Sequence, residues 1–256
     1  MQATVETLNV FPVKGMSATR LDHVVLSPGE GVPGDRLFGF ARPGSGFNPA
    51  APEPLPKEKF VVLAKEAELA GLRTEFLDGT LQITGAAGTT VFDMNDPAGR
   101  QAAAQYLHAV LELREDTPPE FVSAAPHRFT DVSVVSPQMM NAVSLLNLET
   151  LRAFEAATGE NISPDRFRAN IVFSGVPAWS EMQDTGMEIA LGDVVVRTIL
   201  RTQRCAATEV NPETAERDLK VPYLLRRTYG HMDMGVYAEV IAGGTLRTGD
   251  QVAIRL

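Results

Sequence analysis

The chain has 256 residues, a formal net charge of −9 and a single cysteine. This length suits one large domain or two closely packed ones. The negative charge argues against a nonspecific nucleic-acid binder and against a protein that coats anionic membranes, so we expect neither partner. One cysteine excludes an internal disulfide, and no segment of roughly 20 residues is apolar enough to span a membrane. Because the N-terminus shows no signal-peptide pattern, the sequence predicts a cytoplasmic, reduced protein.

The first part of the chain is typical of short strands joined by glycine and proline turns. Strands are expected over residues 3–13, 21–26 and 36–41. The proline- and glycine-rich segment 41–56 predicts an excursion on the surface, with a role that the sequence does not reveal. Helical spacing predicts a helix over 57–72. Asp78-Gly79 predicts the turn of a hairpin within 74–85.

The rest of the chain adds a few helices to a longer series of strands. Asp96 is a cap and Pro97 a first-turn residue for one helix, and Gly159 ends another, which Ser144 or Asn147 could cap. Strands are expected over 131–136, 167–175, 187–192, 193–203, 235–243 and 251–256, and a short helix over 221–230. Many short strands with few helices favour a mainly β protein with a closed or nearly closed barrel over a doubly wound sheet.

The single cysteine, Cys205, follows an arginine at the end of a predicted buried strand. In one uninterrupted strand, alternate side chains would share a face with Cys205, and Arg204 would face the other way, although a bulge near the strand end could bring it round. The side chains on the shared face would be Arg197, Ile199, Arg201 and Gln203. Positive groups near a thiol favour the thiolate, which attacks electrophiles or binds a soft metal. The alternative is a plain packing role, because unpaired cysteines are among the most buried residues.

Several cationic side chains are candidates for binding an anion, and each has a simpler alternative. Lys14 lies where a strand meets a glycine. It is either an anion ligand or a solvated residue of a turn. Asp35 and Arg36 form either a functional pair or an exposed salt bridge. Arg166 and Arg168 would share one face of a strand, either as a forked anion receiver or as two surface charges. The familiar motifs of nucleotide loops, zinc sites and serine hydrolases are missing from the sequence.

Several motifs occur in an order that resembles the MOSC family, whose members are relatives of the C-terminal domain of molybdenum cofactor sulfurase. The motifs are FPVKG, GDR, VSLLN, RFRANI, RCAATEVNPETAERD, GVYAEV and GTLRTGD. The resemblance is strongest from about Ser163 onward. It implies a mainly β protein with a few helices, in which a MOSC-type β-barrel over residues 96–256 packs against a smaller β-rich region over residues 1–95.

The resemblance also implies a cofactor and an activity. Cys205 would be the catalytic residue and the metal ligand, holding molybdenum carried by a pterin cofactor, as in the amidoxime-reducing component. The side chains that would hold this molybdenum cofactor are Lys14, Arg36, Ser144, Asn147, Arg168, Asn170 and Arg204. The implied reaction is the reduction of N-oxygenated small molecules with electrons from a separate donor protein.

Two other functions are compatible with the same residues. One is a sulfur carrier or cofactor-handling protein with a persulfide on Cys205. The other is a module that binds an anionic ligand without turnover. Pyridoxal phosphate is not expected, because no segment resembles the separate sulfurase domain that carries it. The physiological substrate and the oligomeric state cannot be predicted from this sequence.

The sequence departs from the family pattern at three places. The family's PVKS is PVKG here, so Gly15 lacks a side-chain donor, and the second serine of an SxxS pattern is Asn147. The segment 41–56 stands where the reductases have a loop with glutamine and arginine. No ferredoxin-like extension is recognisable, and a single cysteine could not build one. Electrons would therefore come from a separate partner.

Overall fold

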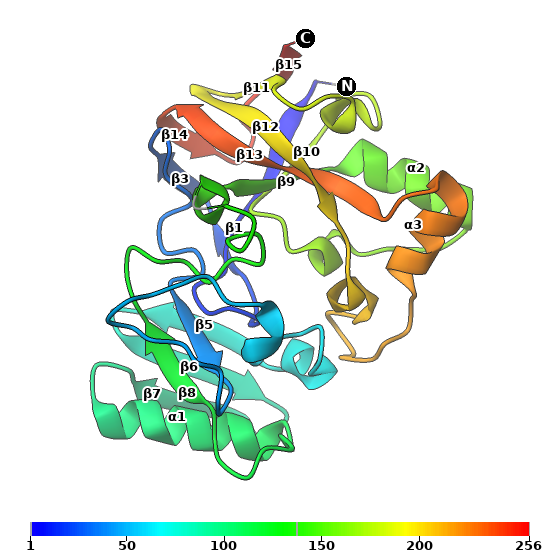
Figure 1. Ribbon diagram of the computed structural model, residues 1–256. Helices are drawn as coiled ribbons and strands as arrows, with labels where there is room; N and C mark the ends of the chain where they lie inside the picture. The colour runs from blue at the N-terminus through cyan, green and yellow to red at the C-terminus, as the bar shows by residue number, and fades with distance from the viewer. Residues whose placement is uncertain (1, 137, 256) are drawn as a thin grey trace.

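The computed structural model describes residues 2–136 and 138–255, which form two parts that lie one above the other in Figure 1. The upper part contains the largest sheet and two α-helices, and the lower part contains smaller sheets and one α-helix. We call these the barrel and the small part. The expectation of a mainly β protein with a few helices is confirmed.

The barrel is built on an eight-stranded sheet with the order β15-β11-β12-β13-β9-β10-β1-β2. Its strands are β1 (Thr4–Val10), β2 (Thr19–Leu21), β9 (Val143–Asn147), β10 (Ile171–Ser174), β11 (Glu188–Leu191), β12 (Val194–Gln203), β13 (Asp233–Ala242) and β15 (Val252–Arg255). Only β9 and β10 pair in parallel. The Val5 N–H donates to the Asp250 carbonyl and the Val252 N–H to the Ala3 carbonyl, both at 2.9 Å. β15 at one end of the sheet therefore meets β1 near the other end, and the sheet closes on itself.

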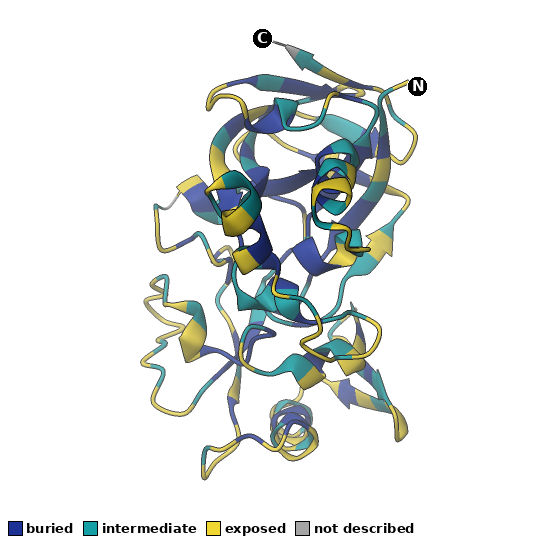
Figure 2. Ribbon diagram, turned by 90° about the vertical axis from the view of Figure 1, so that its right-hand side faces the viewer, coloured by how far each residue is buried: buried dark blue, intermediate teal, exposed yellow. Residues whose placement is uncertain are grey.

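Branched aliphatic side chains fill the barrel. Leu145, Ile171, Ile189 and Val196 have no exposed surface, and Figure 2 shows the inner strands as buried. Two helices, α2 (Leu148–Thr158) and α3 (Val221–Tyr229), cover the outside and share an apolar core of their own. A further strand pair, β3 (His23–Leu26) and β14 (Gly244–Arg247), lies beside the barrel.

The small part combines a three-stranded sheet, a two-stranded sheet and α1 (Pro97–Val110). Its strands are β5 (Arg73–Leu77), β6 (Thr80–Gly85) and β7 (Gly88–Asp93), and the pair β4 (Phe38–Ala41) and β8 (Glu120–Ser123). The hairpin predicted at Asp78-Gly79 is present, and the Asp96 side chain caps α1 by accepting the Ala98 N–H at 3.3 Å. Leu81, Ile83 and Leu107 are fully buried in its core.

Three chain segments lie side by side between the barrel and the small part, and we call them the neck: residues 11–14, 36–38 and 129. Backbone hydrogen bonds tie them together, from the Arg36 N–H to the Phe11 carbonyl (2.7 Å), from the Lys14 N–H to the Phe38 carbonyl (2.8 Å) and from the Phe129 N–H to the Arg36 carbonyl (2.7 Å). The two parts are thus joined by a small hydrogen-bonded unit rather than by one flexible linker.

The cores of the two parts cross the predicted boundary between residues 95 and 96. Val5 and Leu8 belong to the barrel core, although they lie in the first segment. Leu107 packs in the core of the small part, although it lies in the second. The division into folding units 1–95 and 96–256 stays a prediction. In the structure, each of the two cores takes residues from both sides of that boundary.

Two predicted elements are wrong. Residues 57–72 form no α-helix but two short 3-10 turns, η1 (Lys57–Lys59) and η2 (Ala67–Gly71). The reason is that Phe60 to Leu63 are buried in succession, which one face of a helix cannot achieve. The second wrong element is the strand over 131–136, which consists of turns and exposes Val134 and Val135. The predicted strand 251–256 is present as β15, and Leu256 lies outside the described residues.

Other predicted elements are present. Asn147 caps α2 and Gly159 ends it. Segment 41–56 runs over the surface, with Phe47 packed against the aromatic cluster of Phe60 and Phe129. Among the described residues, no helix has the length and apolar character needed to cross a bilayer.

Candidate functional site

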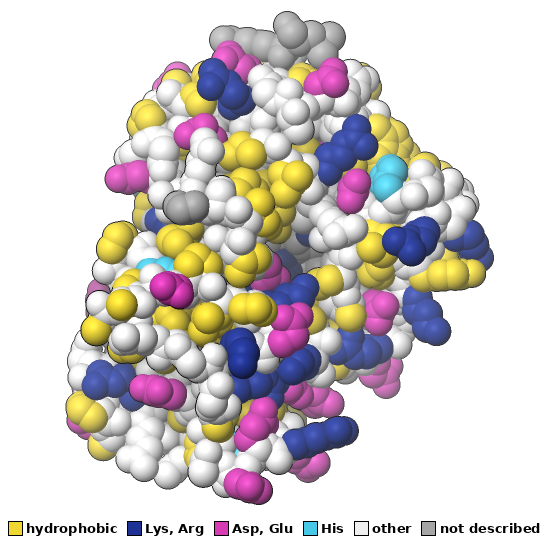
Figure 3. Space-filling view, viewed as in Figure 1, with side chains coloured by type: hydrophobic (Ala, Val, Ile, Leu, Met, Phe, Trp, Pro, Cys, Tyr) yellow, Lys and Arg dark blue, Asp and Glu magenta, His cyan; other side chains and the backbone are white. Residues whose placement is uncertain are grey.

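A cavity of about 320 Å³ lies between the barrel and the small part, and Cys205 is on its wall. Figure 3 shows the molecule hollowed between its upper and lower parts, with hydrophobic side chains on one side of the hollow and Lys or Arg side chains on the other. Six of the predicted cofactor-binding residues line the same cavity as Cys205. They are Lys14, Arg36, Ser144, Arg168, Asn170 and Arg204.

Cys205 stands at the point where β12 ends and a 3-10 turn, η6 (Ala206–Glu209), begins. Its carbonyl accepts the backbone N–H of Thr208 at 3.0 Å and the Thr208 hydroxyl at 2.9 Å, which fixes the turn. The side chain is half-buried. The predicted uninterrupted alternation is wrong, because the pairing of β12 with β13 shifts register three times and both Leu200 and Arg201 are exposed.

Arg204 is buried and lines the same cavity as Cys205, so the two side chains are not separated onto opposite faces as an uninterrupted strand would require. The Arg204 Nε donates to the Met234 carbonyl at 2.7 Å and an Nη to the Phe167 carbonyl at 2.9 Å. Its backbone N–H donates to the Met232 carbonyl at 2.8 Å. Burial lowers the pKa of Arg204 to about 10. These bonds fasten the end of β12 to the start of β13 and thereby hold Cys205 in place.

Two arginines lie against one aromatic ring in the neck. The guanidinium carbons of Arg36 and Arg168 are 4.7 and 4.4 Å from the centre of the Phe11 ring. Both residues have a left-handed backbone with φ of 51°, an unusual conformation for a side-chain-bearing residue and one that gathers at functional sites. The sequence brings them together from points 132 residues apart.

The two guanidinium groups differ in their partners. Arg36 is paired with Asp35, and this charge outweighs burial and raises the pKa of Arg36. Among the residues that the structure describes, no carboxylate or carbonyl accepts a hydrogen bond from the Arg168 side chain. Burial, and then the charge of Arg36, lower the pKa of Arg168 to about 10. Arg168 is therefore a cation whose donors remain available to a ligand.

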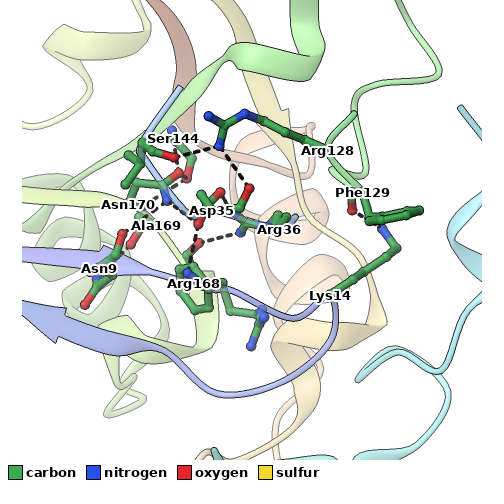
Figure 4. A network of polar contacts seen from close by, with 12 residues as sticks. Asn9, Lys14, Asp35, Arg36, Arg128, Phe129, Ser144, Arg168, Ala169 and Asn170 are labelled. Atoms are coloured by element: carbon green, nitrogen blue, oxygen red, sulfur yellow. Dashed lines mark hydrogen bonds and ion pairs between the residues drawn. The ribbon is translucent and has the colours of Figure 1, made fainter. Parts of the chain in front are cut away.

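A buried polar network supports this pair (Figure 4). The Asp35 carboxylate accepts the Phe11 N–H at 2.8 Å and the Asn170 amide at 3.0 Å. The Ser144 hydroxyl donates to the Asn170 side-chain oxygen at 2.8 Å and accepts the Asn170 backbone N–H at 3.0 Å. Ser144 and Asn170 thus hydrogen-bond to each other, and Asn170 also bonds to Asp35. Through Asp35 they help to position Arg36.

Asn147 does not reach the cavity, which corrects its predicted place in the cofactor site. It is fully buried and accepts the Glu149 N–H at 3.0 Å as the cap of α2. Its amide donates to the Pro177 carbonyl (3.1 Å) and to Glu181 (3.0 Å). The physical reason is the period of a strand, because residues three positions apart, such as Ser144 and Asn147, point to opposite faces.

Lys14 is buried rather than solvated. Its Nζ donates to the Phe129 carbonyl at 2.9 Å and pairs with Asp131, which is half-exposed at the cavity. Burial lowers the pKa of Lys14. Burial raises the pKa of Asp131, but the charges of Lys14 and Lys57 outweigh it and hold that pKa at about 2. Lys14 therefore anchors Asp131 to the neck.

Gly15 explains one departure from the family pattern. Its φ is +84°, and a Cβ at this position would lie 2.7 Å from the Val61 carbonyl oxygen. The backbone of the small part lies directly against this glycine, so the serine of the family motif would not fit here.

The predicted fork of Arg166 and Arg168 on one strand face is wrong. These residues lie in and after a 3-10 turn, η4 (Pro164–Phe167), and they diverge. Arg166 is buried and pairs with both oxygens of Asp218 at 2.7 and 2.9 Å. Only Arg168 turns towards Phe11.

Sequence reasoning missed five residues that line the cavity: Lys57, Thr130, Asp131, Thr202 and Tyr237. The hydroxyls of Thr130 and Thr202 are buried and have no hydrogen-bond partner within the described part of the chain. Tyr237 lies in the GVYAEV motif, so a signal for it existed, and burial raises its pKa. Lys57 and Asp131 stood in segments predicted as a helix and a strand, which gave no reason to select them.

The part of the chain that contains Cys205 is similar to known proteins. The MOSC domain family matches residues 126–253, which is half of the chain. The chain belongs to the MOSC family. Mitochondrial amidoxime reducing component 2 of Rattus norvegicus is 32% identical over 126 residues, covering 44% of this chain and 35% of that protein. Mitochondrial amidoxime-reducing component 1 of Homo sapiens is 24% identical over 172 residues, covering 59% of this chain and 50% of that protein.

The matches to these relatives therefore span between about a third and a half of their lengths. Among solved structures, the YuaD protein of Bacillus subtilis is similar over 99% of this chain and 96% of its own, with 16% identity and a TM-score of 0.45. YiiM of Geobacillus stearothermophilus is similar over 44% of this chain and 54% of its own, with 17% identity and a TM-score of 0.35. Both scores lie below 0.5.

Proposed function

We propose that this protein is an oxidoreductase that binds the molybdenum cofactor in the cavity between its two parts and reduces N-oxygenated small molecules. Cys205 is the metal ligand and catalytic residue in this proposal. The observation that carries it is the opening of two uncommitted groups, the Cys205 thiol and the Arg168 guanidinium, into one cavity. The names of the amidoxime-reducing relatives support the substrate class.

The donor set of the cavity fits such a cofactor. A thiolate suits a soft metal, and a free guanidinium suits a phosphate. The unpartnered hydroxyls of Thr130 and Thr202 offer further donors or acceptors to a polar heterocycle. A buried hydroxyl without a hydrogen-bond partner lowers the stability of the folded protein. A ligand that supplies the missing hydrogen bond would therefore gain binding free energy.

Each residue of the chain then has a task. Arg168 binds the phosphate of the cofactor, and Arg36 adds positive charge beside it while Asp35 fixes its orientation. Arg204 holds the backbone of Cys205, so that the sulfur keeps one position. When bound, the cofactor supplies the redox chemistry at its metal. Electrons come from a separate donor protein, and a cytoplasmic location stays a prediction.

Metal analysis tests the proposal. The protein is purified gently from a host that makes the cofactor, and its molybdenum content is compared with that of Cys205→Ser. We expect stoichiometric molybdenum in the wild type and its loss in the variant, with the far-ultraviolet circular dichroism unchanged. Retention of molybdenum by the variant would refute the role of Cys205.

The same preparations separate the two alternative functions. Cyanide-releasable sulfur on metal-free protein would favour a sulfur carrier with a persulfide on Cys205. Binding of a phosphorylated pterin without metal or releasable sulfur would favour a module that binds an anion without turnover.

A further inference from the structure

Lys57 is a cation of the small part that lines the cavity with Cys205. It is the first residue of η1, directly after the proline-rich segment 41–56. The turn is fixed by its backbone, because the Lys57 carbonyl accepts the Phe60 N–H at 3.0 Å and Phe60 is buried in an aromatic cluster. A rigid turn therefore presents a half-buried lysine towards the thiol from across the hollow.

Three other cations at the cavity wall are engaged in ion pairs. Lys14 pairs with Asp131, Arg36 with Asp35 and Arg166 with Asp218. Within the described residues, no ion pair joins Lys57 to a carboxylate. Among the described residues that line the cavity, Lys57, Arg168 and Arg201 thus lack a carboxylate partner, and of these Lys57 alone comes from the small part.

Lys57 lines the cavity together with Cys205 and Asp131. An ammonium group so placed attracts oxygen atoms with negative charge and repels cationic groups.

The wall near the mouth of the cavity is apolar. Val135 is 62% exposed and Leu200 is 41% exposed, and both line the cavity together with Val132. Exposed aliphatic side chains around a polar centre suit a ligand with an apolar body. The hydrophobic side chains gathered above the hollow in Figure 3 are consistent with this reading.

We propose that Lys57 is a substrate-binding residue that receives the negatively charged oxygen of an N-oxygenated compound above Cys205, while Val135 and Leu200 hold its apolar body. The proposal rests on the proposed function and deepens it, because it names the substrate class. The site favours neutral or anionic molecules with an N–O oxygen on an aryl or alkyl body, and it disfavours cations of the same shape.

Binding measurements test this without any turnover. The protein as isolated is titrated calorimetrically, without an electron donor, with two probes of nearly equal shape. These are N,N-dimethylaniline N-oxide and the N,N,N-trimethylanilinium cation, in which a methyl group replaces the oxygen. We expect the wild type to prefer the N-oxide. Lys57→Met should weaken N-oxide binding about tenfold, the value of a charge-assisted hydrogen bond, and strengthen binding of the cation.

Two further variants keep the result specific. Lys57→Arg retains the charge and should bind the N-oxide within about threefold of the wild type. Lys59→Met removes an exposed charge of the same turn and should leave both affinities unchanged. Equal N-oxide binding by the wild type and Lys57→Met would overturn the proposal, as would an equal loss in Lys59→Met. If Lys57→Met fails to fold, Lys57→Gln replaces it.

The molybdenum content of the same samples separates this proposal from the proposed function. Full molybdenum with probe binding that is insensitive to Lys57 would refute the substrate role alone. Absence of molybdenum with probe binding that depends on Lys57 would refute the proposed function and leave the role of Lys57 intact.

Discussion

The barrel and the small part contribute different kinds of group to the cavity. The barrel supplies side chains such as Ser144, Asn170 and Arg204, whose hydrogen bonds go to neighbouring protein groups. The small part supplies Lys57, which has no carboxylate partner among the described residues. The barrel thus holds the thiol in place and leaves Arg168 as its one guanidinium in this network without a protein acceptor among the described residues, while the small part adds Lys57 as a second cation without a carboxylate partner. Stability should therefore respond mainly to the bonded side chains, and ligand binding mainly to Arg168 and Lys57.

Arg204→Met should have the largest effect on stability. It removes the donors for the carbonyls of Phe167 and Met234 at a buried site. We expect a loss of about 3 kcal/mol in the free energy of unfolding, measured in urea, because buried acceptors remain unpaired. Arg201→Met, on the exposed side of the same strand, is the control. An equal loss in both variants would show that the buried bonds of Arg204 are not what stabilises this end of the barrel.

Gly15→Ser should have the next largest effect. A Cβ at Gly15 would meet the Val61 carbonyl at 2.7 Å, and its φ is +84°. We expect a loss of about 2 kcal/mol from clash and backbone strain together. The control is Gly44→Ser, where φ is also positive (+70°) but nothing lies within 4 Å of the new Cβ. A loss that is no larger at Gly15 than at Gly44 would mean that the small part can move away from the neck.

Glu181 links the barrel's stability to pH. Its carboxylate is fully buried, and burial raises its pKa although Asn147 and Thr150 donate hydrogen bonds to it. Since the folded protein keeps the proton when the unfolded chain has lost it, stability is greatest below the ordinary glutamate pKa and falls as the pH rises through the folded pKa. Glu181→Gln should lack this decrease in the free energy of unfolding, which amounts to about 1.4 kcal/mol for each unit of pKa shift.

The measurement is the difference in unfolding free energy between Glu181→Gln and the wild type from pH 4 to pH 7. The difference should move in favour of the variant as the pH rises. A constant difference would show that Glu181 does not titrate in this range.

Arg168→Met should have the smallest effect on stability. Its guanidinium donates no hydrogen bond within the described residues and stands beside the like charge of Arg36. We expect a change below about 0.5 kcal/mol, typical of a substitution that removes no partner. The proposed function predicts at the same time a large fall in molybdenum content. A large loss of stability instead would place Arg168 with the structural arginines of the barrel.

Much of the barrel and its site could be predicted from the sequence. The short strands and the helix caps at Asp96 and Asn147 follow from local periodicity and capping chemistry. The motifs that resemble the MOSC family also pointed to six of the residues that share the cavity with Cys205.

The rest depends on tertiary contacts that no local pattern encodes. Four successive buried residues, 60–63, reversed the helix prediction, and this placed Lys57 at the cavity. Asn147 was assigned to the cofactor by its motif, but its place three residues after Ser144 turns it to the opposite face of β9. The pair of Asp35 and Arg36 could be proposed from the sequence, but its place beside Arg168, which is left without such a partner, depends on distant segments that meet at Phe11.

The neck has a consequence for how molecules enter and leave. A single linker permits two parts to swing apart, whereas laterally bonded segments, such as those at Phe11, Arg36 and Phe129, oppose both bending and twisting. We therefore expect the barrel and the small part to move as one unit. A large ligand would then enter and leave through the existing opening of the cavity rather than through a gap made by parting the two.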